Sequence, residues 1–403
     1  MQSGGMNAAE AAMQSTAAAG QGAPVAPPLS LSVILPNYNH GKLIPRALRA
    51  LLTQIPPAKE IIVVDDGSTD DSVAVIEDIA RRHPSVRLIR NPVNQGVMAS
   101  VRTATAAATG EFVLFASSDD FVLPGLFSRA RDGLSENPRA AFFCSRVALV
   151  DAADRVIGVR PFTLPCRGRG YLSPEDVRRA IKNSDFWVIG TSTVYRRQLL
   201  ADIGYFDARL GSLSDVLADR LLAFNHGFFF DPAVLGAYNK DPMSFSGRNA
   251  LSVPDSQRLL AAARSWMAEN LPEDVREEHG QLFDRRMRFG LARLWAIWRS
   301  GRLDSDAMAD ILNAGPFDRK VLRALARLPV GSSFLALAFM TLRAPPFGLR
   351  ATLAGLWRAL WFWCFDRAAL TREAEELTRR AAVDPAATDA GFASNMRAFS
   401  NAR

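Results

Sequence analysis

Residues 112–120 read Phe-Val-Leu-Phe-Ala-Ser-Ser-Asp-Asp, and this stretch decides the fold that the sequence predicts. Its uninterrupted apolar run is typical of a strand in a parallel sheet that is covered on both faces. Such sheets place ligand-binding residues just beyond the carboxyl ends of their strands. Adjacent carboxylates repel each other, so Asp119 and Asp120 favour a bound cation or several hydrogen-bond donors at this point. The alternative is that they only cap a helix starting near Leu126.

The chain before this stretch alternates strands and helices in the manner of a βαβ array. Apolar periodicity predicts strands at 31–35, 61–64, 86–89 and 112–116, with helices at 42–53, after Ser68, and at 97–109. Ser68 and Asp71 have the spacing of a capping box, and Gly110 is expected to end the helix at 97–109. We therefore predict an α/β fold with a mostly parallel, Rossmann-like sheet and helices on both faces.

A second pair of carboxylates follows another predicted strand, within Val-Asp-Asp-Gly-Ser-Thr-Asp at 64–70. Because the carboxyl ends of parallel strands meet at one edge, both pairs are expected to serve one ligand, such as a nucleotide with a metal-bound diphosphate. Residues 36–43 lack the glycine and the hydroxyl of a P-loop, and no G-x-G-x-x-G follows the first strand. The sequence thus excludes these two phosphate-binding devices.

Five motifs stand in order at 36–39 (Pro-Asn-Tyr-Asn), 64–70, 94–97 (Asn-Gln-Gly-Val), 109–112 (Thr-Gly-Glu-Phe) and 118–125. Over about residues 30–245 the chain therefore resembles the family-2 glycosyltransferases, which have the GT-A fold. The resemblance implies an inverting transfer from a nucleotide-sugar donor, assisted by a divalent cation, Mg²⁺ or Mn²⁺.

The same resemblance assigns roles to individual residues of the first half. It implies that Pro36 lies at the nucleotide site, that Tyr38 and Asp66 contact the base, that Asp119 contacts the ribose and that Asp120 holds the cation. It leaves open which of the two adjacent aspartates takes the cation. The alternative for Tyr38 is a buried packing aromatic.

Two further positions qualify this assignment. Asp65 is interpreted as a structural acceptor for turn amides. Many relatives have aspartate where this chain has Ser117, so their Asp-x-Asp-Asp is Ser-Ser-Asp-Asp here, which removes one ligand and predicts weaker metal dependence.

The acceptor half is expected between about residues 140 and 245. Gly-Thr-Ser-Thr-Val-Tyr at 190–195 and Ile-Gly-Tyr-Phe-Asp at 203–207 resemble the segment that precedes the catalytic carboxylate of the family. Asp215 is accordingly the predicted general base, although relatives commonly show Glu-Asp where this chain has Ser214-Asp215. The alternative is that Asp215 caps a helix at 216–226.

Other polar residues of this half are less specific. Asp219 is the reserve candidate for the base, or else a surface partner of Arg220. His226 is interpreted as a packing or capping residue, and Lys240 either meets the diphosphate or is solvated. Arg102 lies one position past the arginine of many relatives and is assigned no phosphate.

The formal net charge of +7 and the isoelectric point of about 9.7 favour anionic partners: phosphates, acidic lipid headgroups or nucleic acid. Charge alone supports nucleic acid, so we do not predict it. The cysteines at 144, 166 and 364 are far apart, form no CxxC pair and indicate neither a zinc site nor a disulfide framework, which fits the cytoplasm. Residues 1–29 predict a disordered leader, followed by a GT-A domain at 30–250.

Residues 251–403 are rich in helix formers and predict an all-helical C-terminal region outside the resemblance. An apolar stripe there is flanked by arginines; its members are Met287, Leu291, Leu294, Trp295 and Trp298. This region is predicted to dock on the catalytic domain, to form a homo-oligomer, or to lie on the cytoplasmic membrane face as a peripheral anchor. The longest uncharged run, 328–342, is shorter than the about 18 apolar residues of a spanning helix, so no transmembrane segment is predicted.

No Gln-x-x-Arg-Trp occurs in the chain, which favours transfer of a single sugar over processive synthesis. We predict a glycosyltransferase that acts on a glycan or lipid-linked acceptor in cell-surface polysaccharide biosynthesis. The alternative, kept open by Ser117 and Ser214, is a non-catalytic GT-A scaffold in a glycan-assembly complex.

Overall fold

A computed structural model describes residues 29–151, 153, 155–161, 164–166, 168–184, 187–240, 252–298, 304–328, 331–343, 345–347, 349–361, 372, 375 and 376. Residues 1–28 of the predicted leader, and Cys364, therefore lie outside the described residues. Leu29 opens the first strand, two residues before the expected start at Leu31.

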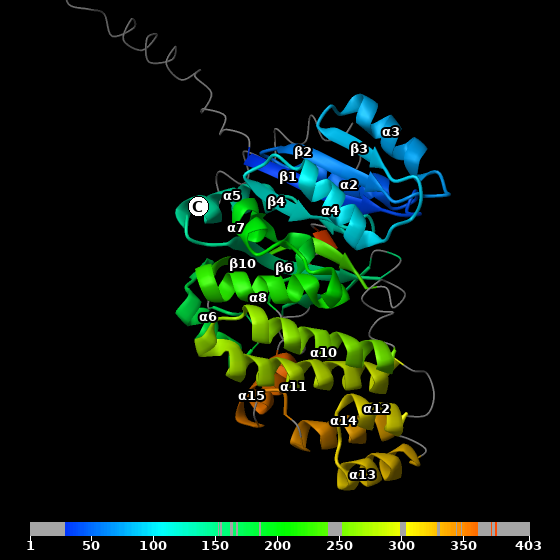
Figure 1. Ribbon diagram of the computed structural model, residues 1–403, viewed down its shortest axis with the longest axis vertical. Helices are drawn as coiled ribbons and strands as arrows, with labels where there is room; N and C mark the ends of the chain where they lie inside the picture. Colours follow the sequence, from blue (N-terminus) through cyan, green and yellow to red (C-terminus); the bar gives the residue numbers. More distant parts are fainter. Residues whose placement is uncertain are drawn as a thin grey trace, which may run out of the picture.

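Strands and helices alternate through the first half of the chain, and only helices follow Ser252 in the described residues (Figure 1). The elements of the first half are β1 (Leu29–Asn37), α2 (Ile44–Leu52), β2 (Ala58–Asp65), α3 (Ser72–Arg82), β3 (Val86–Arg90), α4 (Val97–Ala107), β4 (Phe112–Phe115), β5 (Phe121–Val122) and α5 (Leu126–Glu136). The elements that follow up to residue 239 are β6 (Phe142–Val150), β7 (Val156–Arg160), β8 (Gly170–Leu172), α6 (Pro174–Ile181), the 3₁₀ turn η2 (Gly190–Ser192), β9 (Val194–Arg196), α7 (Arg197–Asp202), the 3₁₀ segment η3 (Ala208–Leu213), α8 (Ser214–His226) and β10 (Phe228–Asn239). The C-terminal helices are α10 (Val253–Asn270), α11 (Glu273–Trp298), α12 (Ser305–Ile311), α13 (Pro316–Ala326), α14 (Ser332–Arg343) and α15 (Leu349–Trp361).

One sheet runs through the α/β domain in the order β3-β2-β1-β4-β9-β6-β10-β5, with β7 beside β6 and β8 beside β10. The first four strands are parallel, β9 is antiparallel to both neighbours, and β6 and β10 are again parallel to each other. Because β2, β1 and β4 are adjacent and parallel, their carboxyl ends lie side by side. The expected α/β architecture is therefore confirmed, with an antiparallel insertion that the periodicity did not indicate.

Both faces of the central parallel strands β1, β2 and β4 are buried, as the continuous apolar runs predicted. Along β2, Ile61 and Val63 pack on one face with α2, whereas Ile62 and Val64 pack on the other face with α4. The second face also takes α6, α8 and α10, so the same apolar core continues beyond the parallel strands.

Two local predictions were wrong. Helix α3 begins at Ser72, so Ser68 is not its cap, and Asp71 makes no capping bond with its side chain. The hydroxyl of Ser68 instead donates to Asp65 and holds the turn after β2. Helix α4 ends at Ala107, so Gly110 does not end it. A Cβ at Gly110 would lie 2.6 Å from the backbone nitrogen of Ser32, so this glycine is required by the close approach of β1.

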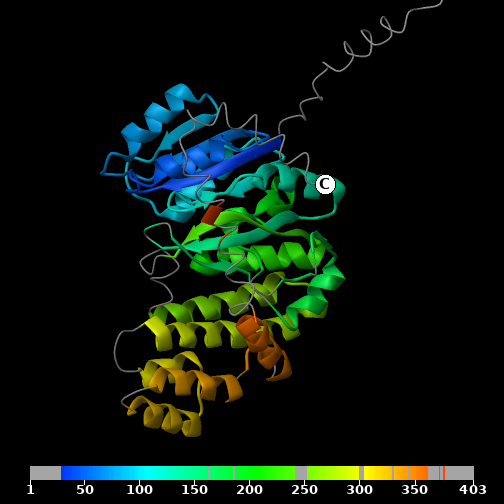
Figure 2. The same ribbon diagram turned by 180° about the vertical axis from the view of Figure 1, so that it is seen from behind.

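The C-terminal helices stack beyond α8, on the side of the molecule away from β1–β3 (Figures 1 and 2). Helix α10 packs against η3 and α8, α11 packs against α10, and α14 packs against α11 and α13. These helices share an apolar core of their own; its members include Leu260, Leu291, Ala292, Met308, Leu322 and Met340. In the described part of the chain, no helix is long and apolar enough to cross a membrane.

The predicted stripe on α11 is only partly visible in the described side chains. Leu291 is buried and Met287 packs on the core, whereas the side chains of Leu294, Trp295 and Trp298 lie outside the described residues. Arg286, which the sequence placed with the surrounding charge, is instead buried at 2% exposure. It donates hydrogen bonds to the carbonyl oxygens of Ile181 and Lys182 at the end of α6, so it fastens the helical region to the α/β domain.

Candidate donor site and catalytic carboxylates

The end of β1 is joined to the end of β2 by side chains as well as by the sheet ladder. Asn37 is in register with Asp65, and its Nδ2 donates to Asp65 Oδ2 at 2.9 Å. The Ser68 amide and hydroxyl donate to the same carboxylate at 3.0 and 2.6 Å. Asp65 is buried, so it acts as the structural acceptor that the sequence indicated.

Asp66 connects the end of β2 to the loop that precedes α4. Its Oδ1 accepts from Asn91 Nδ2 at 2.7 Å and from the Gln95 amide at 3.0 Å, and its Oδ2 accepts from the Gly96 amide at 2.8 Å. The motifs at 64–70 and 94–97 are thus one structural unit. A contact between Asp66 and a nucleotide base stays a prediction.

The residues at the end of β1 surround the same edge. Pro36 is half-buried in register with Val64, and Tyr38, just past the strand, is 43% exposed. The alternative of a buried packing aromatic is therefore wrong for Tyr38. An aromatic ring that is open to solvent at a sheet edge is free to stack on a base.

Asp119 and Asp120 follow β4, but the structure gives them different surroundings. Asp120 is buried, and both of its oxygens are engaged: Thr191 Oγ1 donates to Oδ2 at 2.5 Å and the Asn239 amide donates to Oδ1 at 2.8 Å. Burial, together with the neighbouring Asp119 charge, raises the pKa of Asp120 to about 7. Asp119 is half-buried, and its carboxylate accepts a short hydrogen bond from the Ser117 hydroxyl.

Neither aspartate caps α5. The N-cap of α5 is Gly125, which has a positive φ of 93°, and no side chain caps this helix. Arg46 of α2 instead donates to the backbone oxygen of Asp119 at 2.7 Å and lies over the ring of Phe121. The turn after β4 is therefore held by α2, which leaves the carboxylate of Asp119 at the edge of the sheet.

The acidic edge after β4 offers only a few ligands to a divalent cation. Among the described residues, no group of three or more histidine, cysteine, aspartate or glutamate side chains is placed to hold a metal by itself. Mg²⁺ in nucleotide sites commonly uses one or two carboxylates and takes its other ligands from phosphates and water. The edge formed by Asp119 and Asp120 fits such a shared site and not an all-protein cage.

Asp215 lies in the first turn of α8, half-buried beside the turn η2. Its Oδ1 accepts from the Val216 amide at 2.7 Å, and Oδ2 would lie 3.9 Å from a Cβ placed on Gly190. Burial raises the pKa of Asp215. Since Thr191, the next residue of the turn, donates to Asp120, the turn η2 joins the two candidate sites. The N-cap of α8 is Leu213, so Asp215 is not the helix cap.

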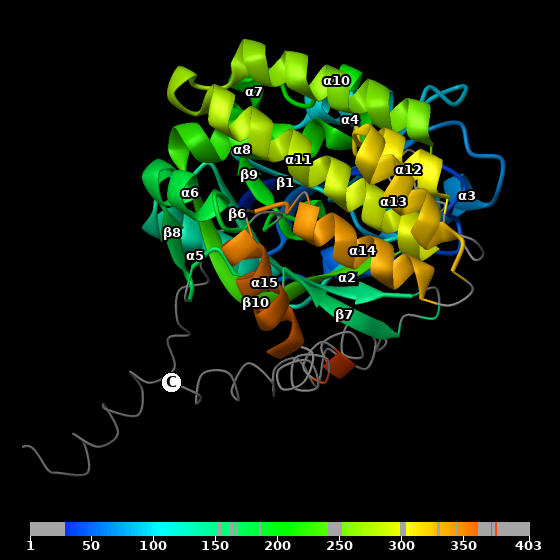
Figure 3. The ribbon, with the colours of Figure 1, turned by 90° about the horizontal axis from the view of Figure 1, so that it is seen from below.

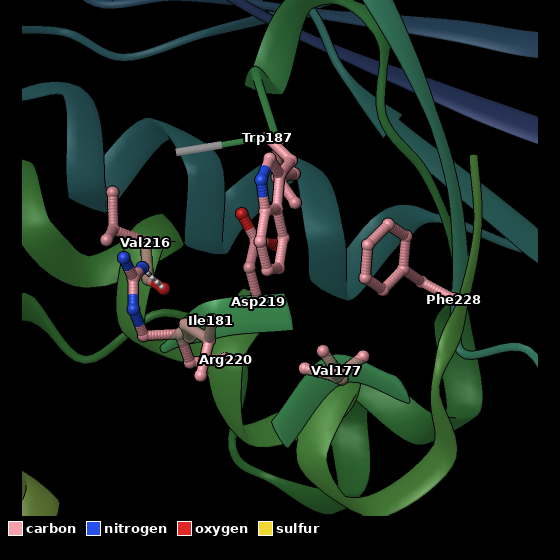
Figure 4. Close-up of a pocket in the computed structure, with 9 residues that line it drawn as sticks. Val177, Ile181, Trp187, Val216, Asp219, Arg220 and Phe228 are labelled. Atoms are coloured by element: carbon pink, nitrogen blue, oxygen red, sulfur yellow. Dashed lines mark hydrogen bonds between the residues drawn. The ribbon is translucent and has the colours of Figure 1, made fainter. Parts of the chain in front are cut away.

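Asp219, one helical turn later, is buried and accepts a hydrogen bond from the Tyr195 hydroxyl at 2.7 Å. Burial and the charge of Asp215 raise the pKa of Asp219 well above its usual range. Figure 4 shows it beside a cavity of about 30 Å³, lined by Trp187, Arg220, Phe228 and other residues. That volume holds about one water molecule and no sugar, so Asp219 is neither a surface residue nor open to an acceptor.

Lys240 and His226 lie at the ends of β10 and α8. Burial and the neighbouring Arg160 and Arg293 lower the pKa of Lys240, although its side chain is largely exposed. The carbonyl oxygen of His226 accepts from the Tyr171 hydroxyl at 2.8 Å, and a packing or capping role of the His226 side chain stays a prediction. The sequence alone assigned no role to Thr191 or Tyr195. Both lie in the motif at 190–195 that resembles the family, and this was the signal that could have identified them.

The sequence profile described as Glycosyl transferase family 2 matches residues 32–204. The uncharacterized glycosyltransferase YibD of Escherichia coli (strain K12) is 32% identical over 174 residues, which are 42% of this chain and 49% of that protein. The chain belongs to glycosyltransferase family 2. The match thus spans about half the length of YibD.

A longer match is with the uncharacterized protein MT1568 of Mycobacterium tuberculosis (strain CDC 1551 / Oshkosh), 33% identical over 312 residues. It covers 74% of this chain and 90% of that protein, so it includes part of the helices after residue 251. Among solved structures, S. aureus TarS 1-349 in complex with UDP-GlcNAc superposes with a TM-score of 0.55 at 19% identity, over 81% of this chain and 92% of the other. This likeness confirms the GT-A fold of the glycosyltransferase.

Proposed function

We propose that the glycosyltransferase moves one sugar from a nucleotide-sugar donor to a hydroxyl of a glycan or lipid-linked acceptor, with inversion at the anomeric carbon. The supporting observation is the turn η2, in which Thr191 donates to Asp120 while the neighbouring Gly190 lies beside the carboxylate of Asp215. The fold likeness to TarS, whose structure contains UDP-GlcNAc, favours a nucleotide-sugar donor.

In this proposal the carboxyl ends of β1, β2 and β4 bind the donor. Tyr38 stacks on the base, and Asp66 orders the loop at 91–96 around it. Asp119 is better placed than Asp120 to meet the cation, because both oxygens of Asp120 already accept hydrogen bonds within the protein. Asp120 then does not bind the cation itself; its buried negative charge stabilises the cation that is bound at Asp119.

A divalent cation, Mg²⁺ or Mn²⁺, would neutralise the charge that develops on the leaving diphosphate. Asp215 accepts the proton of the acceptor hydroxyl while that oxygen bonds to the anomeric carbon and the bond to the diphosphate breaks. A carboxylate whose pKa is raised by burial is a stronger base at neutral pH, and such a base typically contributes about 10²- to 10⁴-fold. A single carboxylate on this face is sufficient for inversion.

The test separates binding from chemistry. Calorimetric titration with UDP, GDP, dTDP and CMP, each with and without Mn²⁺, identifies the nucleotide. Hydrolysis of the matching nucleotide-sugar, with water in the place of the acceptor, then measures turnover without a known acceptor. Asp215→Asn is expected to bind the nucleotide as the parent does and to lose about 10²-fold or more in hydrolysis.

Asp202→Asn, an exposed carboxyl at the end of α7, is the matched control and should leave both quantities unchanged. Equal loss of hydrolysis in the two variants would contradict the role of Asp215. Ser117, which stands where many relatives have aspartate, favours a second candidate: a scaffold that binds nucleotide without turnover. Hydrolysis by the parent protein excludes the scaffold.

A further inference from the structure

The outer side of α14 is apolar and exposed to solvent. Phe334, Leu335, Ala338 and Leu342 lie on one side of this helix, and Phe334 and Leu342 are 74% and 67% exposed. The opposite side packs on α11 and α13. Soluble proteins rarely expose contiguous apolar side chains in this way unless the surface binds something.

Helix α15 extends the same kind of surface. Leu349, Leu353 and Trp357 are spaced four residues apart, so they share one side of the helix, and they are 47%, 51% and 65% exposed. Figure 3 shows α14 and α15 next to each other, on the face of the molecule that is away from β1–β3. We call these seven residues of the two helices the α14–α15 patch.

The sequence around the patch is basic without interruption. Residues 319–365 contain no aspartate or glutamate and seven cations, namely Arg319, Lys320, Arg323, Arg327, Arg343, Arg350 and Arg358. Three of them pair with acids of α12 and α13: Arg319 with Asp310, Arg323 with Asp306, and Arg343 with Asp318. Lys320, Arg327 and Arg350 are exposed and pair with no acid among the described residues. The segment that carries the apolar surface therefore also carries unneutralised positive charge.

We infer that the α14–α15 patch binds the surface of an anionic lipid bilayer. A helix surface with apolar residues, a tryptophan and arginines matches the boundary between headgroups and acyl chains. Neither helix could span the bilayer, so the protein would lie on the membrane. The contact does not depend on glycosyl transfer, whereas its use, to reach a lipid-linked acceptor, rests on the proposed function.

Charge disfavours two other occupants of the patch. A second copy that paired patch to patch would bring the unneutralised cations together, which costs free energy. Residues 362–403 of the same chain contain six acids and six cations, so they offer the patch no net electrostatic attraction. An anionic bilayer complements both the apolar side chains and the charge.

The experiment is sedimentation of the full-length protein with lipid vesicles. Vesicles of phosphatidylcholine are compared with vesicles of equal parts phosphatidylcholine and phosphatidylglycerol, at low and high salt. We expect sedimentation with the anionic vesicles, weaker binding at high salt because exposed charges are screened, and little binding to phosphatidylcholine alone.

Two variants separate the apolar and charged contributions. Phe334→Ser with Leu342→Ser is expected to weaken binding about tenfold or more, because two apolar side chains no longer enter the bilayer. Arg327→Gln with Arg350→Gln is expected to weaken binding to anionic vesicles about tenfold. Ile157→Ser, which removes an apolar side chain on β7 that is 43% exposed, is the control and should leave binding unchanged.

Each contrary outcome overturns the inference. If the parent protein stays in solution with anionic vesicles, the patch is no membrane site. If the parent protein stays in solution as a dimer, and the variant Phe334→Ser with Leu342→Ser is a monomer, the patch is an interface between copies. Equal vesicle binding by this variant and Ile157→Ser would place any membrane contact elsewhere. Hydrolysis of the nucleotide-sugar in solution is measured separately, so failure of one proposal leaves the other standing.

Discussion

Replacement of Arg286 by methionine should weaken the attachment of the helical region to the catalytic domain and lower the free energy of unfolding. The guanidinium donates to Ile181 O at 2.5 Å and to Lys182 O at 3.3 Å from one nitrogen, and to Pro346 O at 3.3 Å from Nε. It also lies 4.2 Å from the centre of the Phe347 ring. Arg286→Met keeps most of the apolar stem in place and removes all of these contacts.

The expected cost follows from the groups that lose their partner. A buried acceptor that is left without a donor costs about 1–3 kcal/mol, and a desolvated cation–π contact contributes about 2 kcal/mol. Methionine recovers part of the packing, and Lys182 is exposed enough for water to replace its donor. We therefore expect the free energy of unfolding to fall by about 4 kcal/mol, which is a large part of the stability of an ordinary domain.

Urea unfolding followed by circular dichroism measures this loss, and the neighbouring residue provides the control. Arg285 is exposed and makes no hydrogen bond or ion pair with the described residues, so Arg285→Met should change the free energy of unfolding by no more than about 0.5 kcal/mol. Arg286→Lys, which keeps the charge and one donor, should fall between the two. Similar, small losses in Arg285→Met and Arg286→Met would refute the idea that this buried arginine fastens α11 to α6.

Two further predictions concern the donor edge. Because burial and Asp119 raise the pKa of Asp120 to about 7, its protonated form stabilises the fold below about pH 4, and this contribution is lost as the pH rises through about 7. In metal-free buffer with a chelator, the free energy of unfolding of the parent, measured with urea, should therefore fall by about 2.5 kcal/mol relative to that of Asp120→Asn between about pH 5 and about pH 8. A difference between the two proteins that does not change with pH would show that Asp120 titrates normally. Asp66→Asn turns an NH₂ group toward the amides of Gln95 or Gly96, so the loop loosens and nucleotide affinity in calorimetry should fall about tenfold. Asp71→Asn, an exposed carboxyl at the start of α3, is the control for both, and an equal effect of Asp71→Asn and Asp66→Asn on affinity would contradict the role of the loop.

Much of the catalytic domain could be predicted because its signal is local. The apolar runs of β1, β2 and β4 identify strands that are buried on both faces, and adjacent carboxylates after β2 and β4 identify the edge where a ligand binds. The errors were also local. Ser68 had the spacing of a helix cap, but Asp65, three residues earlier, is buried and takes its hydroxyl as a donor, so α3 starts later.

The sequence by itself determined the order of the elements, the family, and the acidic edge of the sheet, since these depend on residues close together in the chain. Only the tertiary structure decided which protein groups donate hydrogen bonds to the acids of each pair. Asp120 takes its donors from Thr191 and Asn239, 71 and 119 residues further along the chain. It likewise decided that Arg286 is buried and Arg285 exposed, through a hydrogen bond across 105 residues. The physical reason is that the cost of burying a charge is set by its partners, and those partners are brought together only when the chain folds.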